Sequence, residues 1–278
     1  MKTRIITACV ALCILIPVLF FSGTIILCIS VAAVAVISLS EMLKCIGASK
    51  PCISVPLYIY AVVSPFLVRY MDNLYHFAII AFIAVALYLM YLFTLTVISH
   101  GELSFGDAAT VFTASMYIIA ALNAIIYVRD FGNFGKYIYL LIFLGAWVTD
   151  TFAYFTGVLF GKHKLIPDVS PKKTIEGSIG GTLFCSASFI LFGIIIDVFF
   201  GSNANLIFLA VGGFIMALIS QIGDLIMSVI KRHYGIKDYG KIFPGHGGML
   251  DRFDSILAVS LGVAMMCMFV TLTGINIL

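Results

Sequence analysis

Charge is what this chain has least of. Lys, Arg, Asp and Glu together make up 10% of its 278 residues, hydrophobic residues make up 62%, and the mean hydropathy is +1.16. In a soluble globular protein about a quarter of the residues are charged, so this composition excludes a soluble globular domain. The net charge is only +3, and we expect no nucleic-acid partner.

Paired metal-ligand spacings are also absent. The seven cysteines are scattered and lie mostly within apolar stretches, so they are interpreted as small packing residues. The chain has no tandem repeat of clear period, no low-complexity linker and no Ser-His-Asp arrangement. These absences exclude a repeat architecture, a cysteine-based zinc site and a serine hydrolase.

Long apolar runs are abundant. A helix needs roughly twenty apolar residues to cross a membrane, and about nine stretches qualify, so the sequence predicts an all-α polytopic membrane protein. The third stretch is the weakest, because it is short and contains Pro56 and Pro65. The predicted spans cover residues 5–22, 24–44, 54–71, 76–99, 108–128, 137–159, 178–200, 205–230 and 256–276.

The N-terminus has two interpretations. Lys2 and Arg4 precede the run IITACVALCILIPVLFF, an order typical of a secretory signal. A second span begins soon after Ser22 and Gly23 without an Ala-x-Ala-like cleavage site. This favours a retained membrane span.

The basic residues predict the topology. Alternating the loops between two faces places 13 Lys and Arg residues on one face and 3 on the other, and such an excess marks the cytoplasmic side. We therefore predict a cytoplasmic N-terminus, a C-terminus on the opposite side, and cytoplasmic loops at 161–177 and 231–255. The minority face holds Arg69, Arg129 and Lys136.

Residues whose side chains could bind a ligand or take part in catalysis concentrate in the second half of the chain. We predict a transmembrane scaffold over 1–135 and a transmembrane catalytic region, with a polar site at its cytoplasmic side, over 136–278. Acids and one histidine of the first region fall at predicted span ends, where charge is ordinary. They are Glu41, Asp72, His76, Glu102 and Asp107.

A polar stripe ends the eighth predicted span. In QIGDLIMSVIKR, Asp224, Ser228 and either Lys231 or Arg232 are spaced to share one helical face. An interhelical ion pair is one explanation. Because the stripe carries an acid, a hydroxyl and cations towards the polar loop, a functional site is favoured.

The segment HGGMLDRFD holds a second cluster. His246 and two glycines form a turn whose backbone can approach a ligand. Asp251 and Asp254, which flank Arg252, share a face at the start of the last span. Near Asp224 they would form an oxygen-rich site for a hard cation such as Mg²⁺. Alternatively, the two acids only stabilise a helix N-terminus.

A third cluster spans residues 161–181, GKHKLIPDVSPKKTIEGSIGG. Hydroxyls and cations ahead of a helix N-terminus attract phosphate, although a positive-inside loop would explain the lysines. Asp150, on the preceding span, either joins the site or bonds within the bundle. The candidate substrate-binding residues are Ser170, Lys172, Lys173, Thr174, Glu176, Ser228 and Asp150.

The segment SVIKRHYGIKDYGKIFPGHGGMLDRFD, from Ser228 to Asp254, resembles the signature of the phosphatidate cytidylyltransferase (CDP-diacylglycerol synthase) family. SPKKT-x-EG and the D-x-x-A-Y-x-x-G beginning at Asp150 are similar to that family too, except that Ile175 stands where members often carry tryptophan. The resemblance implies an enzyme that makes CDP-diacylglycerol and pyrophosphate from CTP and phosphatidate. It implies that Asp224, Asp251 and Asp254 hold Mg²⁺, with a monovalent cation such as K⁺ nearby, and it leaves a homodimer open.

The residue types suit such a reaction. A phosphate monoester is already anionic at neutral pH, because its second pKa is about 6, so no general base is required. The departing pyrophosphate calls for cations, and the candidate catalytic residues are Lys231, Arg232, Lys241, His246 and Arg252. His246 is favoured as a turn former or phosphate hydrogen-bond donor. The alternatives are a CTP transferase for another lipid phosphate and, in another class, an ion-coupled transporter.

Overall fold

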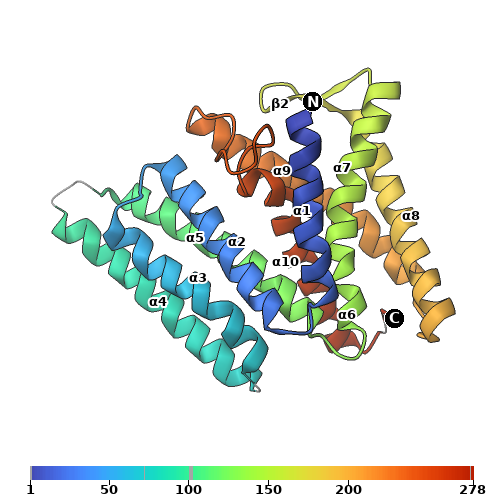
Figure 1. The fold of residues 1–278 in the computed structure, drawn as a ribbon, viewed down its shortest axis with the longest axis horizontal. Helices are drawn as coiled ribbons and strands as arrows, with labels where there is room; N and C mark the ends of the chain where they lie inside the picture. Colours follow the sequence, from blue (N-terminus) through green and yellow to red (C-terminus); the bar gives the residue numbers. More distant parts are fainter. Residues whose placement is uncertain (1, 72, 100–102, 276) are drawn as a thin grey trace. The chain divides into compact units, whose positions relative to one another are not determined.

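The computed structural model of the protein describes residues 2–71, 73–99, 103–275 and 277–278 (Figure 1). Most of these residues are helical, and they form two compact units. The first unit comprises Met1–Tyr127 and Tyr234–Arg252, and the second comprises Val128–His233 and Phe253–Leu278. The predicted all-α class is confirmed. The predicted functional boundary at residue 135 stays a prediction.

Consecutive helices and one long loop build the first unit. The helices are α1 (Lys2–Phe20), α2 (Ile25–Ile46), α3 (Pro51–Tyr70), α4 (Leu74–Ile98) and α5 (Phe105–Arg129), the last two residues of which fall in the second unit. The loop 234–249 joins this unit from far along the chain. It leads into α10 (Leu250–Thr273), whose first three residues belong here.

The second unit contains the remaining elements. They are the short α6 (Gly135–Ile138), α7 (Leu140–Phe160), the strands β1 (Lys164–Ile166) and β2 (Ser170–Thr174), α8 (Ile175–Phe200), α9 (Leu206–His233) and α10 from Phe253 onwards. The strands pair antiparallel, with Lys164 opposite Thr174. This hairpin was not predicted, because both strands are short and lie within one polar loop.

Among the described residues, eight helical stretches are long and apolar enough to cross a membrane. They correspond to predicted spans two to nine, and the chain is an integral membrane protein. The first predicted span is helical, but its apolar part with described side chains covers only Val10–Phe20. The side chains of Lys2 and Arg4, and all of Asp72 and Glu102, lie outside the described residues.

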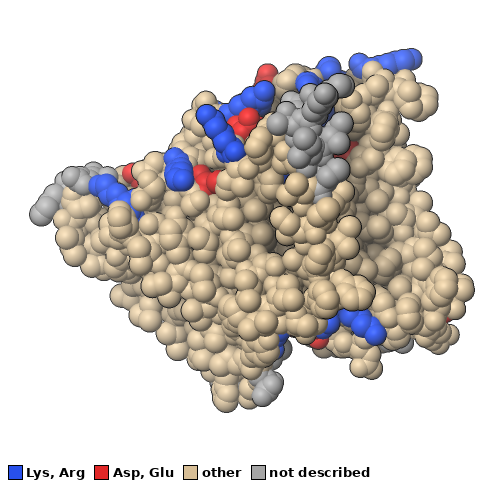
Figure 2. All heavy atoms as spheres, in the orientation of Figure 1, with Lys and Arg blue, Asp and Glu red and all other residues tan. Residues whose placement is uncertain are grey.

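The surfaces between the helix ends are apolar. Figure 2 shows the charged atoms near the helix ends, with uncharged side chains between them on the face in view. Large side chains such as Phe82, Leu183 and Leu191, in the middle parts of their helices, are exposed. Lipid tails are as apolar as these side chains, so their exposure is expected in a membrane.

The third span forms in spite of its two internal prolines. Pro56 has no N–H to donate to the carbonyl of Cys52, one helical turn earlier. The Tyr91 hydroxyl of α4 donates to that carbonyl instead, at 2.8 Å. A main-chain group without a partner is costly in lipid, and this bond from a neighbouring helix lets α3 continue.

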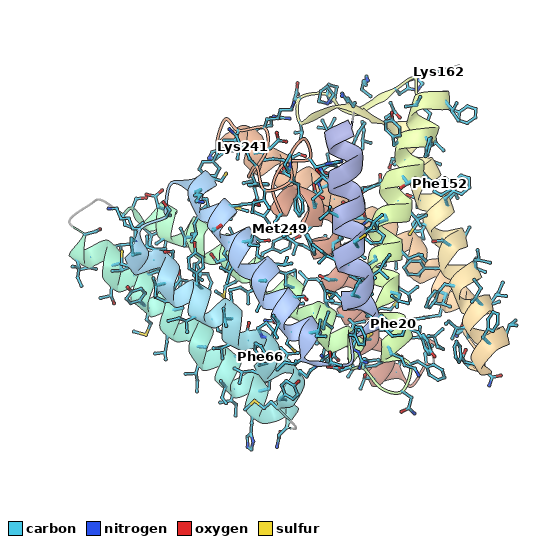
Figure 3. All side chains as sticks on the ribbon, viewed as in Figure 1. Phe20, Phe66, Phe152, Lys162, Lys241 and Met249 are labelled. Atoms are coloured by element: carbon cyan, nitrogen blue, oxygen red, sulfur yellow. The ribbon has the colours of Figure 1, made fainter. Side chains whose placement is uncertain are left out.

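Close packing joins α7 to α8. Phe152 of α7, labelled in Figure 3, stacks on Phe184 of α8, with ring centroids 4.0 Å apart. A Cβ added to Gly181 would lie 2.7 Å from the Thr149 carbonyl oxygen, and one added to Gly177 would lie 2.6 Å from that of Ala153. Small residues are therefore required at these two positions of α8. This contact holds α7, the hairpin and the start of α8 as one assembly.

Candidate active site

The stripe predicted on α9 is present in the second unit. Asp224 is half-buried, and Ser228, one turn later, has its Oγ 3.5 Å from Asp224 Oδ1. Asp224 Oδ2 lies 2.5 Å from Lys173 Nζ of β2, and both side chains are 25% exposed. The structure thus brings an acid predicted to bind metal next to a lysine predicted to bind nucleotide.

Two further acids of the second unit lie near this pair. The Asp254 carboxylate, on α10, interacts electrostatically with Asp224, Asp150 and Lys231. Asp150 Oδ2 accepts a bond from Ser255 Oγ at 3.1 Å, which places α7 beside α10. Since three carboxylates would repel one another, the lysines offset their charge in this arrangement.

The hairpin positions Lys173 through its own local bonds. Thr174 caps α8, because its Oγ1 accepts the N–H of Gly177 at 3.1 Å. Glu176 Oε1 lies 2.7 Å from His163 Nδ1 across the hairpin. The side chains of Thr174 and Glu176 therefore have a structural role. Their predicted part in nucleotide binding stays a prediction, as do those of Ser170 and Lys172.

The motif D-x-x-A-Y-x-x-G has two parts with different surroundings. Asp150 reaches Ser255 and Asp254, as described above, whereas Ala153 and Gly157 face the glycines of α8. Their small size is explained by helix packing. The tyrosine of the motif, Tyr154, is 67% exposed.

The loop 234–249 is held by carboxylates in the first unit. Asp251 Oδ2 accepts the N–H groups of Tyr239 and Gly248, at 2.8 and 2.9 Å, and Asp251 is 8% exposed. Gly247 has φ +86°, and a Cβ there would lie 2.7 Å from Asp251 Oδ2. Gly247 is thus needed because the loop folds tightly over this carboxylate, whereas a Cβ on Gly248 would meet the carboxylate of Glu41.

The remaining candidates lie on or next to this loop. Lys241 and Arg252 are exposed, and Figure 3 labels Lys241 and Met249 on this part of the chain. The N–H of His246 donates to the Phe243 carbonyl at 2.8 Å, so this residue forms a turn as predicted. Its Nδ1 is buried and has no hydrogen-bond partner among the described residues.

The residues predicted to hold metal divide between the two units. Asp224 and Asp254 lie together in the second unit, and Asp251 belongs to the first, three residues before Asp254 on α10. No group of three or more His, Cys, Asp and Glu side chains is arranged to hold a metal ion in the described part of the chain. Mg²⁺ commonly takes one or two carboxylates together with substrate phosphates and water. The donor types of Asp224 and Asp254 fit that requirement.

Sequence reasoning missed Glu41 of α2. It was interpreted as an ordinary interfacial charge, and that interpretation is wrong, because Glu41 is 4% exposed. Its carboxylate accepts the N–H groups of Met249 and Leu250, each at 2.9 Å. An acid near the C-terminal end of its own helix is unfavourable, and this was the one available signal.

Comparison with known proteins decides the family. The sequence model described as "Cytidylyltransferase family" matches residues 2–270. The chain belongs to that family. The match extends through the N-terminal half, whereas the motifs that carry the resemblance all lie between Asp150 and Asp254.

Curated relatives support the same assignment. The protein named phosphatidate cytidylyltransferase from Staphylococcus haemolyticus is 38% identical over 264 residues, covering 93% of this chain and 96% of the relative. Proteins of the same name from Staphylococcus saprophyticus and Staphylococcus aureus are each 37% identical, with the same coverage. The predicted resemblance is confirmed.

Proposed function

We propose that this protein is a CTP:phosphatidate cytidylyltransferase, a membrane nucleotidyltransferase of phospholipid biosynthesis. The observation that carries the proposal is the cluster in the second unit, where Asp224, Asp254 and Asp150 lie near Lys173 and Lys231. Membership of the cytidylyltransferase family and relatives named phosphatidate cytidylyltransferase support the choice of substrates.

The reaction needs charge control more than proton transfer. A phosphate oxygen of phosphatidate attacks the α-phosphorus of CTP, a new P–O bond forms, and the bond to the β-phosphate oxygen breaks. Pyrophosphate leaves with the electron pair. The lipid phosphate is anionic at neutral pH, because its second pKa is about 6, so no base has to remove a proton. Lys173 and Lys231 would stabilise the charge that develops on the phosphates.

Asp224 and Asp254 would hold Mg²⁺, and Asp251 is the third ligand that the family resemblance implies. When bound, Mg²⁺ would neutralise phosphate oxygens and stabilise the leaving group. Lys173 lies 2.5 Å from Asp224, so it would be ready to contact a phosphate next to that carboxylate. Binding of K⁺ and formation of a homodimer stay predictions.

The proposal is tested with purified protein in detergent. CTP, phosphatidate and Mg²⁺ are expected to yield CDP-diacylglycerol and pyrophosphate in equal amounts, and omission of Mg²⁺ is expected to stop the reaction. An isoprenoid-ether analogue of phosphatidate, offered in parallel, distinguishes a transferase for another lipid phosphate. Absence of CDP-diacylglycerol with every metal and lipid combination would overturn the assignment.

Sidedness forms a second part of the proposal. The site would face the cytoplasm, where CTP is dissolved, because most basic residues occupy the loops at that end. Single cysteines replacing Lys164 and Lys237, on a background without exposed native cysteines, should react with an impermeant maleimide only from the cytoplasmic side. Lys136→Cys is the matched control for the opposite side. Labelling of Lys164→Cys and Lys237→Cys from opposite sides would refute a shared site.

A further inference from the structure

Glu41 is a buried acid far from the sequence motifs. It lies on α2, 208 residues before its hydrogen-bond partner Met249, and it is 4% exposed. Oε1 accepts the Met249 N–H and Oε2 accepts the Leu250 N–H, both at 2.9 Å. Both oxygens of the carboxylate are therefore bonded to the main chain at the start of α10.

The charge of Glu41 suits this position. The first N–H groups of a helix have no partner within the helix and carry partial positive charge. A buried carboxylate is costly unless it receives hydrogen bonds, and α10 supplies them. Each group thus satisfies the other. A phosphate would bind the same N–H groups, so Glu41 occupies a place that could otherwise receive a substrate anion.

Two glycines of the loop, Gly240 and Gly248, pack directly against the same carboxylate. A Cβ added to Gly240 or Gly248 would collide with Glu41 Oε1. On the other side of the loop, Asp251 accepts the N–H groups of Tyr239 and Gly248. Glu41 and Asp251 together accept hydrogen bonds from four main-chain N–H groups, and these bonds hold the second half of the loop against the two carboxylates. The four donors are Tyr239, Gly248, Met249 and Leu250.

We propose that Glu41 is a positioning residue for the cytidylyl transfer, acting as a built-in anion that closes the N-terminus of α10. It orients the first turn of that helix, and with it Asp251 and Asp254. Substrate phosphates are then recognised by side-chain cations and not by the main chain of Gly248, Met249 and Leu250. This inference rests on the proposed function, since it assigns Glu41 a part in that reaction.

The first test uses Glu41→Gln, which keeps the size of the side chain and removes its charge. The amide –NH₂ cannot accept a hydrogen bond, so either the Met249 or the Leu250 N–H loses its partner. Hydrogen–deuterium exchange of peptides from 234–252 should accelerate at least about tenfold, because their main-chain protection depends on these bonds. Peptides from 164–174 should exchange as in the wild type.

Kinetics of the same variant separate positioning from general damage. Misplacement of reacting groups by about 1 Å can lower the rate about 100-fold, and we expect kcat to fall by that order. The KM for CTP should stay within about twofold of the wild type, because none of the residues proposed to bind the nucleotide lies on α10 or in the loop 234–249. A KM that rises in proportion as kcat falls would overturn the proposal.

Ser38→Ala is the matched control. Ser38 lies on α2 one turn before Glu41, is fully buried, and its Oγ has no hydrogen-bond partner among the described residues. Its exchange pattern and kcat should match those of the wild type. If Ser38→Ala produced the same changes as Glu41→Gln, the effect would belong to α2 in general and the proposal would fail.

A second variant probes the contact if Glu41→Gln is not recovered as a monodisperse protein. Gly240→Ala keeps Glu41 but places a methyl group against its carboxylate, so it should also accelerate exchange in 234–252 and lower kcat. Unchanged exchange in a folded variant refutes the contact. Accelerated exchange with wild-type kcat refutes the positioning role alone. A wild-type protein without transferase activity refutes the proposed function, while the exchange result still judges the contact.

Discussion

The carboxylates of the two units have different kinds of bonding partner. In the second unit, Asp224 faces Lys173, and Asp254 interacts with other acids and with Lys231. In the first unit, Glu41 and Asp251 bind main-chain N–H groups and are almost completely buried. The acids of the second unit thus have side-chain cations as neighbours, whereas those of the first unit bond to the main chain and support the loop 234–249.

Asp224→Asn should have the largest effect on activity. The amide keeps the shape but removes the charge that would bind metal and pair with Lys173, so we expect kcat to fall on the order of 10³-fold. Thermal stability in detergent should change little, because the pair is partly exposed. Asp168→Asn, an exposed acid in the hairpin turn, is the control and should remain fully active. Activity near that of the wild type in Asp224→Asn would remove this residue from the site.

Asp251→Asn should reduce both activity and stability. Its charged oxygen accepts two main-chain N–H groups in a buried position, and replacing it by an amide should cost about 1–3 kcal/mol of folding free energy. We expect kcat to fall about 100-fold through the displaced loop. The loss of stability is measured by heating the protein and then following the remaining monodisperse fraction by size-exclusion chromatography. An Asp251→Asn protein as stable as Asp224→Asn would erase the distinction between the two units.

Gly181→Ala should affect stability with the smallest change in activity. The added Cβ would lie 2.7 Å from the Thr149 carbonyl oxygen and 3.0 Å from Ala153 Cβ, so α7 and α8 must separate slightly. We expect a loss of about 1–3 kcal/mol, seen as a lower Tm, and a kcat within about tenfold of the wild type. Gly106→Ala is the control, since its Cβ would meet only Ser104 Oγ at 3.6 Å. Equal Tm values for the two variants would contradict the close packing of α7 and α8.

Most of the helical architecture could be predicted because it depends on local composition. Roughly twenty consecutive apolar residues cross a membrane whatever their neighbours are, and eight of the nine predicted spans meet that criterion in the described residues. Even α3, the weakest prediction, forms a helix. The reason it tolerates Pro56 could not be predicted, because the compensating bond comes from Tyr91 on another helix.

The candidate site was predicted only in part. The stripe on α9 follows from helical spacing, and the hard oxygen donors follow from residue type. The pairing of Lys173 with Asp224 joins residues 51 positions apart through a hairpin that was not predicted. Thr174 and Glu176 proved to hold that hairpin and the start of α8, which residue type alone does not reveal.

Hydrophobic transfer and helical periodicity act over neighbouring residues, so the local sequence is enough to predict that this chain enters a membrane as helices and which of its segments are polar. The bonding partners of each buried acid, in contrast, depend on contacts between distant parts of the chain. Glu41 and Asp224 are both acids in apolar helices, and the residues around each of them do not reveal its hydrogen-bond or ion-pair partner. Their hydrogen-bond partners come from distant parts of the chain, and those partners make Glu41 a support for the loop 234–249 and leave Asp224 facing a lysine.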